Sequence, residues 1–323
     1  MPRVFVSAPL HGDAEARLRA AHEVVVGQGL GDGDAWVTLL TDRVDAVRLA
    51  AAPRLKIVAN VAVGVDNIDL EACRARGVVV SNTPGVLTEA TADLAFGLIL
   101  AARRRIAEGD RLVRGNGWRG WTPTLLVGER VHGSTLGIVG LGRIGQAVAR
   151  RARGFGMPVL YTQRVRLAPD LERSLGAEYA ELDDLLARSD IVSLHCPLTV
   201  DTRGLLSAER LSRMKPGSVL INTSRGPVVD EAALAAALET GPLAAAGLDV
   251  YEDEPRVNPR LLERSNVVLA PHIASADRPT REAMARMAVD NVLAVLDAQA
   301  PPNPVSAGAP SFTANRPPAR PAT

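Results

Sequence analysis

Short apolar runs alternate with helical stretches along most of this chain, in two successive series. In the first series the runs begin at Arg3, Glu23, Ala35, Lys56 and Gly77. Near-continuous apolar runs are typical of parallel strands in a sheet that helices cover on both faces. The pattern therefore predicts an α/β architecture built on parallel sheets.

A long helical pattern separates the two series. It covers residues 88–114, follows a turn signal at 82–85 and carries apolar residues at helical spacing. We expect one helix without a break over this range. The second series then reads TLGIVG, PVLYT, DIVSLHC, SVLINTS, AAGLDV and NVVLAPH, and a last helix is expected over 279–296.

Two strand series joined by one helix predict two domains with a cleft between them. One domain would comprise residues 1–100 and 285–300, because the last helix can carry the chain back to it. The other would comprise residues 101–284. Residues 301–323 are rich in Pro and Ala, with little to bury, so we expect that tail to be disordered.

Composition argues against several classes of protein. The net charge is +1, so nothing favours a nucleic acid or an anionic membrane surface as partner. No apolar stretch approaches the ~18 residues of a membrane span, and the first residues do not resemble a signal peptide. Cys73 and Cys196 form no metal-binding spacing and suit a reducing compartment. We expect a cytoplasmic protein without a metal ion.

The segment 140–145 reads GLGRIG, directly after an apolar strand and at the start of a helix. In that context the first glycine permits a tight turn, the second lets the backbone approach a pyrophosphate, and the third lets helix and strand pack closely. The helix N-terminus attracts the anion. The segment predicts a dinucleotide site, whose cofactor-binding residues include Gly140, Leu141, Gly142, Arg143 and Ile144.

The next strand ends without the acid that an NAD site usually carries about 20 residues further on. The sequence there is LYTQRVR, and the first carboxylate after it is Asp170. Arg164 and Arg166 stand where the 2′-phosphate of NADP would lie, and a guanidinium matches phosphate geometry. The alternative is two exposed arginines in an arginine-rich chain. The pattern favours NADPH, with Gln163 and Arg164 among the contacts and NADH as a weaker substitute.

Three polar segments follow strands of the second series, at 222–230, 247–255 and 271–275. They are expected at the carboxyl edge of the sheet, where ligands bind in open α/β folds. They carry an arginine, carboxylates and a histidine, which are the groups that reduction of a 2-oxo acid requires. The arginine would hold the substrate carboxylate and polarise the ketone, the histidine would donate the proton, and a carboxylate would orient the imidazole.

These segments resemble the D-isomer-specific 2-hydroxyacid dehydrogenase family, and within it the glyoxylate/hydroxypyruvate reductases. The resemblance runs from about Lys56 to Asn303. It includes NVAVGVDNID from Asn60, NTPGVLTEATADLAFGL from Asn82 and HGSTLGIVGLGRIGQA from His132. It implies that residues 1–100 and 285–300 form a flavodoxin-like, substrate-binding domain, and that residues 101–284 form a Rossmann-type, NADP-binding domain. It also implies NADPH-dependent reduction of a small 2-oxo acid, glyoxylate or hydroxypyruvate, to the D-2-hydroxy acid by a homodimer.

The resemblance also implies roles at matching positions. Arg225 would bind the substrate, Glu254 would pair with His272, and His272 would be the acid/base. The backbone N–H groups of Val63 and Gly64 would bind the substrate carboxylate. Further cofactor contacts would come from Thr91, Cys196, Pro197, Thr223, Ser224, Asp249, His272 and Ala274.

Some alternatives stay open at this stage. Certain family members carry a tryptophan that reaches the substrate pocket from the stretch that aligns with residues 123–128, but this chain has Leu125 there. A 2-ketogluconate reductase with the same site is therefore a second reading, and a nucleotide-sensing, corepressor-like binding protein is a third. Asp230 is expected to cap a helix rather than act as a catalytic acid. His195 is expected to line the cleft wall and is the next candidate for the acid/base.

Overall fold

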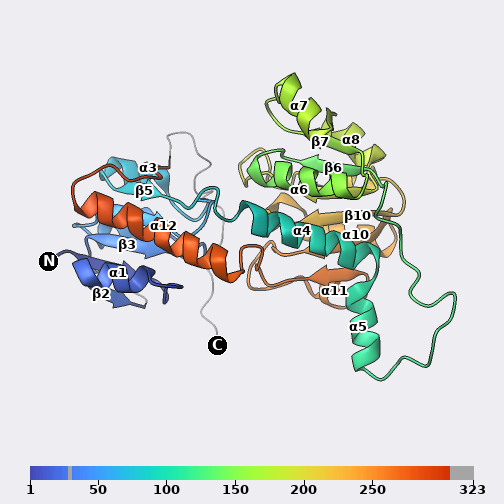
Figure 1. Cartoon of the computed structure of the whole chain (residues 1–323), viewed down its shortest axis with the longest axis horizontal. Coiled ribbons are helices and arrows are strands. Elements are labelled where there is room, and N and C mark those ends of the chain that lie inside the picture. The colour runs from blue at the N-terminus through green and yellow to red at the C-terminus, as the bar shows by residue number, and fades with distance from the viewer. Residues whose placement is uncertain (28–30, 306–323) are drawn as a thin grey trace. The chain divides into compact units, whose positions relative to one another are not determined.

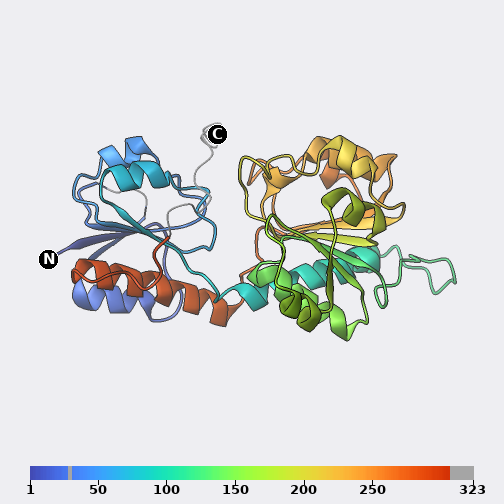
Figure 2. The same cartoon turned by 90° about the horizontal axis from the view of Figure 1, so that it is seen from above.

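The computed structural model describes residues 1–27 and 31–305. Within these residues the chain divides into two compact units, one made of residues up to 87 together with 275–305, and the other of residues 88–274. Each unit is a parallel sheet flanked by helices, as Figures 1 and 2 show. In the described part of the chain, no helix combines the length and the apolar character that a membrane span requires.

The first unit has the strand order β2-β1-β3-β4-β5, which is the flavodoxin-like doubly wound order. Figure 2 shows α12 (red) and α1 (blue) on one face of this sheet and the two short helices α2 and α3 on the other. The strands are β1 (Arg3–Val6), β2 (Glu23–Val26), β3 (Ala35–Thr38), β4 (Ile57–Asn60) and β5 (Val79–Ser81). The helices are α1 (Ala14–Ala21), α2 (Ala46–Ala50), α3 (Leu70–Ala75) and α12 (Arg278–Leu296).

The second unit has the order β12-β11-β10-β9-β6-β7-β8, with the first strand, β6, inside the sheet as in a Rossmann fold. One apolar core packs beneath α4 and α6, and the other beneath α8, α9 and α10. The strands are β6 (Leu136–Val139), β7 (Val159–Thr162), β8 (Ala177–Tyr179), β9 (Ile191–Leu194), β10 (Ser218–Asn222), β11 (Leu243–Leu248) and β12 (Val267–Leu269). The helices are α4 (Thr88–Arg103), α5 (Ile106–Arg114), α6 (Arg143–Gly154), α7 (Pro169–Leu175), α8 (Leu182–Arg188), α9 (Ala208–Ser212), α10 (Glu231–Glu239) and α11 (Pro259–Leu262), with a 3-10 turn at Gly226–Val228.

The chain passes from one unit to the other at 87/88 and 274/275, whereas the sequence predicted boundaries at 100/101 and 284/285. Helix α4 belongs to the second unit because Ala92, Ala95 and Ile99 are buried in its core. Helix α12 belongs to the first unit because it packs on α1, β3 and β4. Helical periodicity shows that a helix has a buried face, but not which sheet covers that face.

The expected continuous helix over 88–114 is interrupted, so that prediction is wrong at its centre. Arg105 has a left-handed φ of +54° and separates α4 from α5. The carbonyl of Arg103 accepts the N–H of Glu129 at 2.8 Å. A Cβ on Gly128 would lie 2.3 Å from that same carbonyl, so the returning chain at 128–129 occupies the place of the next helical turn.

The chain end differs from expectation as well. Residues 301–305 are ordered, because the Val305 N–H donates to the Val80 carbonyl at 2.8 Å and the Asn303 N–H donates to Asn291 Oδ1 at 2.8 Å. The rest of the tail for which disorder was expected, 306–323, lies outside the described residues. Strand β8 was not expected, because its three residues, AEY, form no apolar run.

Candidate active site

The turn between β6 and α6 is built on three glycines. Gly140 has a left-handed φ of +95°, and a Cβ there would lie 2.8 Å from the backbone nitrogen of Cys196. A Cβ on Gly145 would lie 2.3 Å from the Gly140 carbonyl, so the strand and helix can pack this closely only without a side chain. Gly142 is the N-cap residue of α6. A Cβ built on it would lie within 4 Å of no atom in the rest of the described chain, so the space in front of the helix is open. This geometry fits a pyrophosphate at the helix N-terminus.

The residues around that turn differ in exposure. Leu141 is buried, whereas Arg143 is exposed and Ile144 is half-buried in the first turn of α6. The Leu141 N–H donates to Gln163 Oε1 at 3.0 Å. The other end of that amide, Nε2, donates to the Val165 carbonyl at 2.6 Å. Gln163 thus ties the segment after β7 to the glycine turn.

The two arginines expected at a 2′-phosphate lie in different environments. Arg164 is exposed and makes no hydrogen bond or ion pair with any residue in the described ranges. Arg166 forms a two-pronged ion pair with Glu172, with its Nε and one terminal nitrogen 2.8 and 2.9 Å from the carboxylate oxygens. The expectation that both arginines face a phosphate is therefore corrected: the guanidinium of Arg166 already has an internal partner.

Arg225 lies in the turn after β10, and Asn222 shapes that turn. The buried Asn222 accepts hydrogen bonds on Oδ1 from the Ser224 N–H at 3.0 Å and hydroxyl at 2.8 Å, and its Nδ2 donates to the Arg225 carbonyl at 3.0 Å. The next residue, Gly226, approaches Tyr251 so closely that a Cβ would lie 1.8 Å from the Tyr251 carbonyl carbon. Glycine at 226 therefore brings the half-buried Arg225 beside the turn at 251–254.

Glu254 and His272 form a hydrogen-bonded pair at the same edge of the sheet. His272 Nδ1 lies 2.8 Å from Glu254 Oε2, and the other carboxylate oxygen accepts the Tyr251 N–H at 3.0 Å. Burial acts to raise the pKa of the Glu254 carboxyl, but the hydrogen bond from His272 and the charges of His272 and Arg225 hold that pKa below its ordinary value. Glu254 is thus a carboxylate at neutral pH. His272 Nε2 makes no hydrogen bond with the described residues.

Asp249 holds the backbone that carries His272. Its two carboxylate oxygens accept the N–H groups of Ile273 and Ala274, both at 2.8 Å, and the residue is fully buried. His272 itself has a left-handed φ of +55°, an uncommon conformation for a residue with a side chain. The hydrogen bonds from the two following N–H groups to Asp249 fix this conformation. In these contacts Asp249 therefore positions the backbone that carries His272.

A second buried carboxylate supports the turn that carries Glu254. Glu231, at the start of α10, accepts the Glu252 N–H at 2.6 Å. Burial raises the pKa of the Glu231 carboxyl, and the hydrogen bond from Glu252 partly offsets that effect. Asp230 caps α10 by accepting the Ala233 N–H at 2.9 Å, so the expected capping role is confirmed.

In the first unit, the loop after β4 holds Val63 and Gly64 in a defined orientation. Asn82 Nδ2 donates to the Val63 carbonyl and Asn60 Nδ2 to the Gly64 carbonyl, both at 2.8 Å. Asn60 is fully buried and its Oδ1 accepts the Thr38 hydroxyl at 3.0 Å. Within the described residues, the N–H groups of Val63 and Gly64 donate to no acceptor. The amides thus bind the carbonyls and leave the N–H groups available to an anion.

The other expected cofactor contacts occupy the edges of the second unit. Thr91 is buried on α4, and Cys196 is buried beside Gly140 while Pro197 is exposed. The hydroxyl of Thr223 is buried without a hydrogen-bond partner in the described part of the chain. Burial raises the pKa of the Cys196 thiol to about 11, so it stays protonated.

His195 is unsuited to the role of acid. Burial lowers its pKa to about 4, so its imidazole is neutral at physiological pH, and its Nε2 lies 2.8 Å from Ser193 Oγ. The described residues contain no group of three or more His, Cys, Asp or Glu side chains arranged to hold a metal ion.

The sequence reading missed the residues that position this site. They hold backbone groups rather than ligands, and they are Asn60, Asn82, Asn222 and Glu231. Asn60 and Asn222 each end an apolar strand, and a buried amide at a strand end is a signal that could have identified them.

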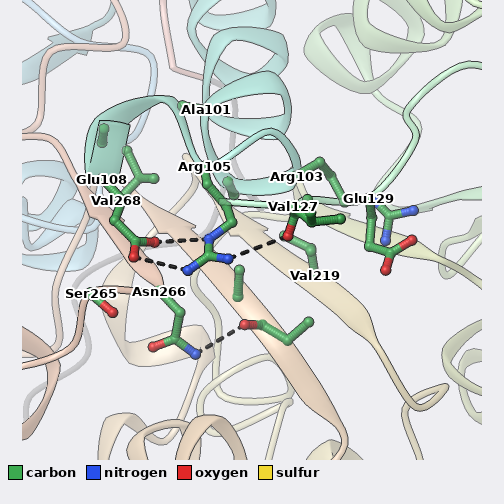
Figure 3. A pocket seen from close by; sticks show the side chains of 15 residues that line it. Ala101, Arg103, Arg105, Glu108, Val127, Glu129, Val219, Ser265, Asn266 and Val268 are labelled. Carbon is green, nitrogen blue, oxygen red and sulfur yellow. Dashed lines mark hydrogen bonds and ion pairs between the residues drawn. The ribbon is translucent and has the colours of Figure 1, made fainter. Parts of the chain in front are cut away.

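A cavity of about 260 Å³ lies elsewhere in the second unit (Figure 3). Its lining includes Val219, Ala245 and Val268, near the amino ends of β10, β11 and β12, together with the junction of α4 and α5. In Figure 3 the Arg105 guanidinium spans it to reach Glu108 and the Val127 carbonyl. Because the strands are parallel, this cavity is at the sheet edge opposite His272 and takes no part in the chemistry.

Comparison with known proteins gives the family of the chain. Residues 96–274 match the model of the D-isomer specific 2-hydroxyacid dehydrogenase NAD-binding domain. The chain is 53% identical to a glyoxylate reductase of Thermococcus litoralis, over 94% of this chain and 97% of that protein. It is 49% identical to a glyoxylate reductase of Korarchaeum cryptofilum, over 94% and 96% of the two chains.

Solved structures give the same result. The TT0316 protein of Thermus thermophilus superposes with a TM-score of 0.88 and 46% identity, covering 94% of this chain and all of that one. An NADPH-dependent glyoxylate/hydroxypyruvate reductase of Sinorhizobium meliloti, in complex with NADP and malonate, superposes with a TM-score of 0.86 and 37% identity, covering 94% and 97%.

Proposed function

The chain belongs to the D-isomer specific 2-hydroxyacid dehydrogenase family of oxidoreductases, and we propose that it reduces glyoxylate, and also hydroxypyruvate, with NADPH. The observation that carries this proposal is the Glu254–His272 pair, which lies beside Arg225 at the sheet edge that also holds the glycine turn. That edge combines a proton donor, a cation for a carboxylate and a dinucleotide site.

The proton step follows from the pair's geometry. Glu254 engages Nδ1 of His272, which fixes the ring, and Nε2 remains to face a substrate. The bound dinucleotide supplies a hydride to the carbonyl carbon. His272 Nε2 gives its proton to the carbonyl oxygen, and the product is the 2-hydroxy acid, glycolate from glyoxylate or D-glycerate from hydroxypyruvate.

Substrate binding is assigned to groups that suit a carboxylate. The asparagine amides hold the carbonyls of Val63 and Gly64, and the N–H groups of these two residues have no acceptor among the described residues. Arg225 adds a cation that polarises the ketone. The first unit is thus proposed to bind the substrate, and the second to bind the nucleotide.

The preference for NADPH rests on Arg164. The segment after β7 offers an exposed arginine with no partner in the described residues and no carboxylate free to bond a ribose 2′-hydroxyl, since Glu172 is engaged by Arg166. Gly140, Leu141, Gly142, Arg143, Ile144, Gln163, Thr91, Thr223, Ser224 and Ala274 complete the proposed cofactor contacts.

We also propose that the enzyme works in the cytoplasm as a homodimer. Two buried, unpaired cysteines suit a reducing compartment. The segment from α5 onward exposes Ile106, Val113, Trp118 and Trp121, an unusual amount of apolar surface that a second copy could cover. Light scattering of the purified protein tests the dimer.

A panel of 2-oxo acids with NADPH and NADH tests the proposed function. We expect NADPH oxidation to be most efficient with glyoxylate or hydroxypyruvate. A higher kcat/KM with 2-ketogluconate would support the second reading, for which Leu125 leaves room. Nucleotide binding without turnover on any acid would instead indicate a nucleotide-sensing protein.

A further inference from the structure

Arg166 is the only cation within ion-pair distance of Glu172 in the described part of the chain. The two side chains meet in a fork, with nitrogen–oxygen distances of 2.8 and 2.9 Å. The Tyr161 hydroxyl donates to the same carboxylate at 2.5 Å. The hydrogen bonds from Arg166 and Tyr161 lower the pKa of the Glu172 carboxyl to about 2, so it is ionised at every working pH.

The segment that carries both arginines is held at its two ends. At one end Gln163 binds the N–H of Leu141 in the glycine turn. At the other end Arg166 binds Glu172, and the Leu167 N–H donates to the Tyr161 hydroxyl at 2.9 Å. Arg164 lies between these two anchors, exposed and without a partner among the described residues. One arginine is therefore committed to the protein and the other is available to a ligand.

We propose that Arg166 is a positioning and charge-masking residue for NADPH selectivity, and that it does not bind the 2′-phosphate. It neutralises Glu172, a carboxylate close to the end of β7 that would otherwise repel the phosphate and could favour the ribose 2′-hydroxyl of NADH. Arg164 is the residue that contacts the phosphate. This inference rests on the proposed preference for NADPH.

The side chain of Arg166 also spans Tyr179 on β8, with its guanidinium carbon 5.5 Å from the ring centroid. This ring contact adds to the ion pair with Glu172 in holding the guanidinium, although the Arg166 side chain is 62% exposed.

A double-mutant cycle on Arg166 and Glu172 tests the proposal. The measurement is the ratio of kcat/KM with NADPH to that with NADH, for the wild type, R164A, R166A, E172Q and R166A/E172Q. We expect R164A to lower this ratio by roughly 10- to 100-fold, because it removes a charge-assisted hydrogen bond. R166A should lower it about tenfold by unmasking the carboxylate. R166A/E172Q should return to within about twofold of E172Q.

Two results would overturn the proposal. If the double variant stays as low as R166A, then Arg166 contacts the phosphate directly. If R166A lowers kcat/KM equally with both nucleotides, its role is only structural, and thermal melting of R166A against R166A/E172Q will report that loss. The preference for NADPH is tested separately, by the ratio of kcat/KM values measured for the wild type. A wild-type ratio near one would reject NADPH as the preferred cofactor. The recovery of R166A by the added E172Q substitution would still report on the masking.

Discussion

In the first unit, side-chain amides hold backbone carbonyls of the loop at 63–64, whereas in the second unit, carboxylates hold backbone N–H groups next to Glu254 and His272. Asn60 and Asn82 bind the carbonyls of Gly64 and Val63. Asp249 and Glu231 bind the N–H groups of residues 273, 274 and 252. These two loop regions are thus held by opposite hydrogen-bonding chemistry.

The difference determines what each region can offer a ligand. Where amides occupy the carbonyls, the N–H groups remain available and the backbone itself can bind an anion. Where carboxylates occupy the N–H groups, the loops become rigid supports for side chains such as His272 and Arg225. We infer that one region acts through its backbone and the other through its side chains, and the following substitutions test that contrast.

The largest effect is expected in the second unit, for His272→Ala. A positioned general acid contributes ~10²–10⁴-fold, so kcat for glyoxylate reduction should fall by that factor. Binding of NADPH, followed by fluorescence titration, should persist. His132→Ala, at an exposed histidine of the same unit, serves as the control and should keep its activity. Near-normal turnover by His272→Ala would show that the His272 side chain is not the proton donor.

In the first unit, Asn82→Asp should raise the KM for the 2-oxo acid about tenfold or more. The variant loses the hydrogen bond to the Val63 carbonyl, worth roughly 0.5–1.5 kcal/mol, and adds a negative charge beside the proposed carboxylate site. Asn82→Ala loses only the hydrogen bond and should show a smaller rise. Steady-state kinetics measure both, and the KM for NADPH should not change. Equal values for Ala and Asp would argue against an anion site here.

Asp249→Asn tests the support beneath His272. An amide can accept only one of the two backbone N–H groups, and the unpaired buried donor costs roughly 1–3 kcal/mol. We expect about a tenfold lower kcat with the KM for NADPH little changed. Asp253→Asn, an exposed acid near Glu254, is the matched control. If both variants behave like the wild type, His272 does not depend on this clamp.

The smallest effect is expected for Asp230→Ala, which removes the cap of α10. Loss of such a cap costs typically ~1 kcal/mol of stability. Denaturant unfolding should record that loss, while kcat and KM stay at their wild-type values. A large loss of activity would show that Asp230 has a part in the site after all.

The sequence predicted those features that depend on neighbouring residues. The strand–turn–helix around GLGRIG, the parallel sheets and the cap at Asp230 are encoded locally, in glycine spacing, apolar runs and capping chemistry. The D-isomer-specific 2-hydroxyacid dehydrogenase family was predicted from motifs after the strands of the second sheet, and comparison with known proteins confirmed it.

Features that depend on contacts between residues far apart in the sequence could not be predicted from it. The break at Arg105 arises because residues 128–129 return to the end of α4. Arg164 and Arg166 look alike in sequence, and only the position of Glu172 on α7 separates an exposed arginine from a paired one. Boundaries between the units depend on which sheet a helix covers, and apolar periodicity does not specify that.

The pH dependence of reduction by the wild type and by Glu254→Gln tests the central claim most directly. The pKa of Glu254 lies below its ordinary value of 4.5, so the carboxylate is present throughout the range above that pH and is lost only as the pH falls further. The carboxylate pairs with His272, the group that gives up a proton in reduction. A rate that depends on this carboxylate should therefore hold above that pH and fall only at lower pH, where Glu254 is protonated.

In Glu254→Gln the shape is nearly kept and the charge is removed. We predict that the pH profiles of kcat/KM for glyoxylate reduction and for glycolate oxidation both differ from those of the wild type, because His272 then pairs with a neutral amide instead of a carboxylate. NADPH affinity should be unchanged. A profile that coincides with that of the wild type in both directions would contradict the assignment of Glu254 and His272 as the acid/base pair.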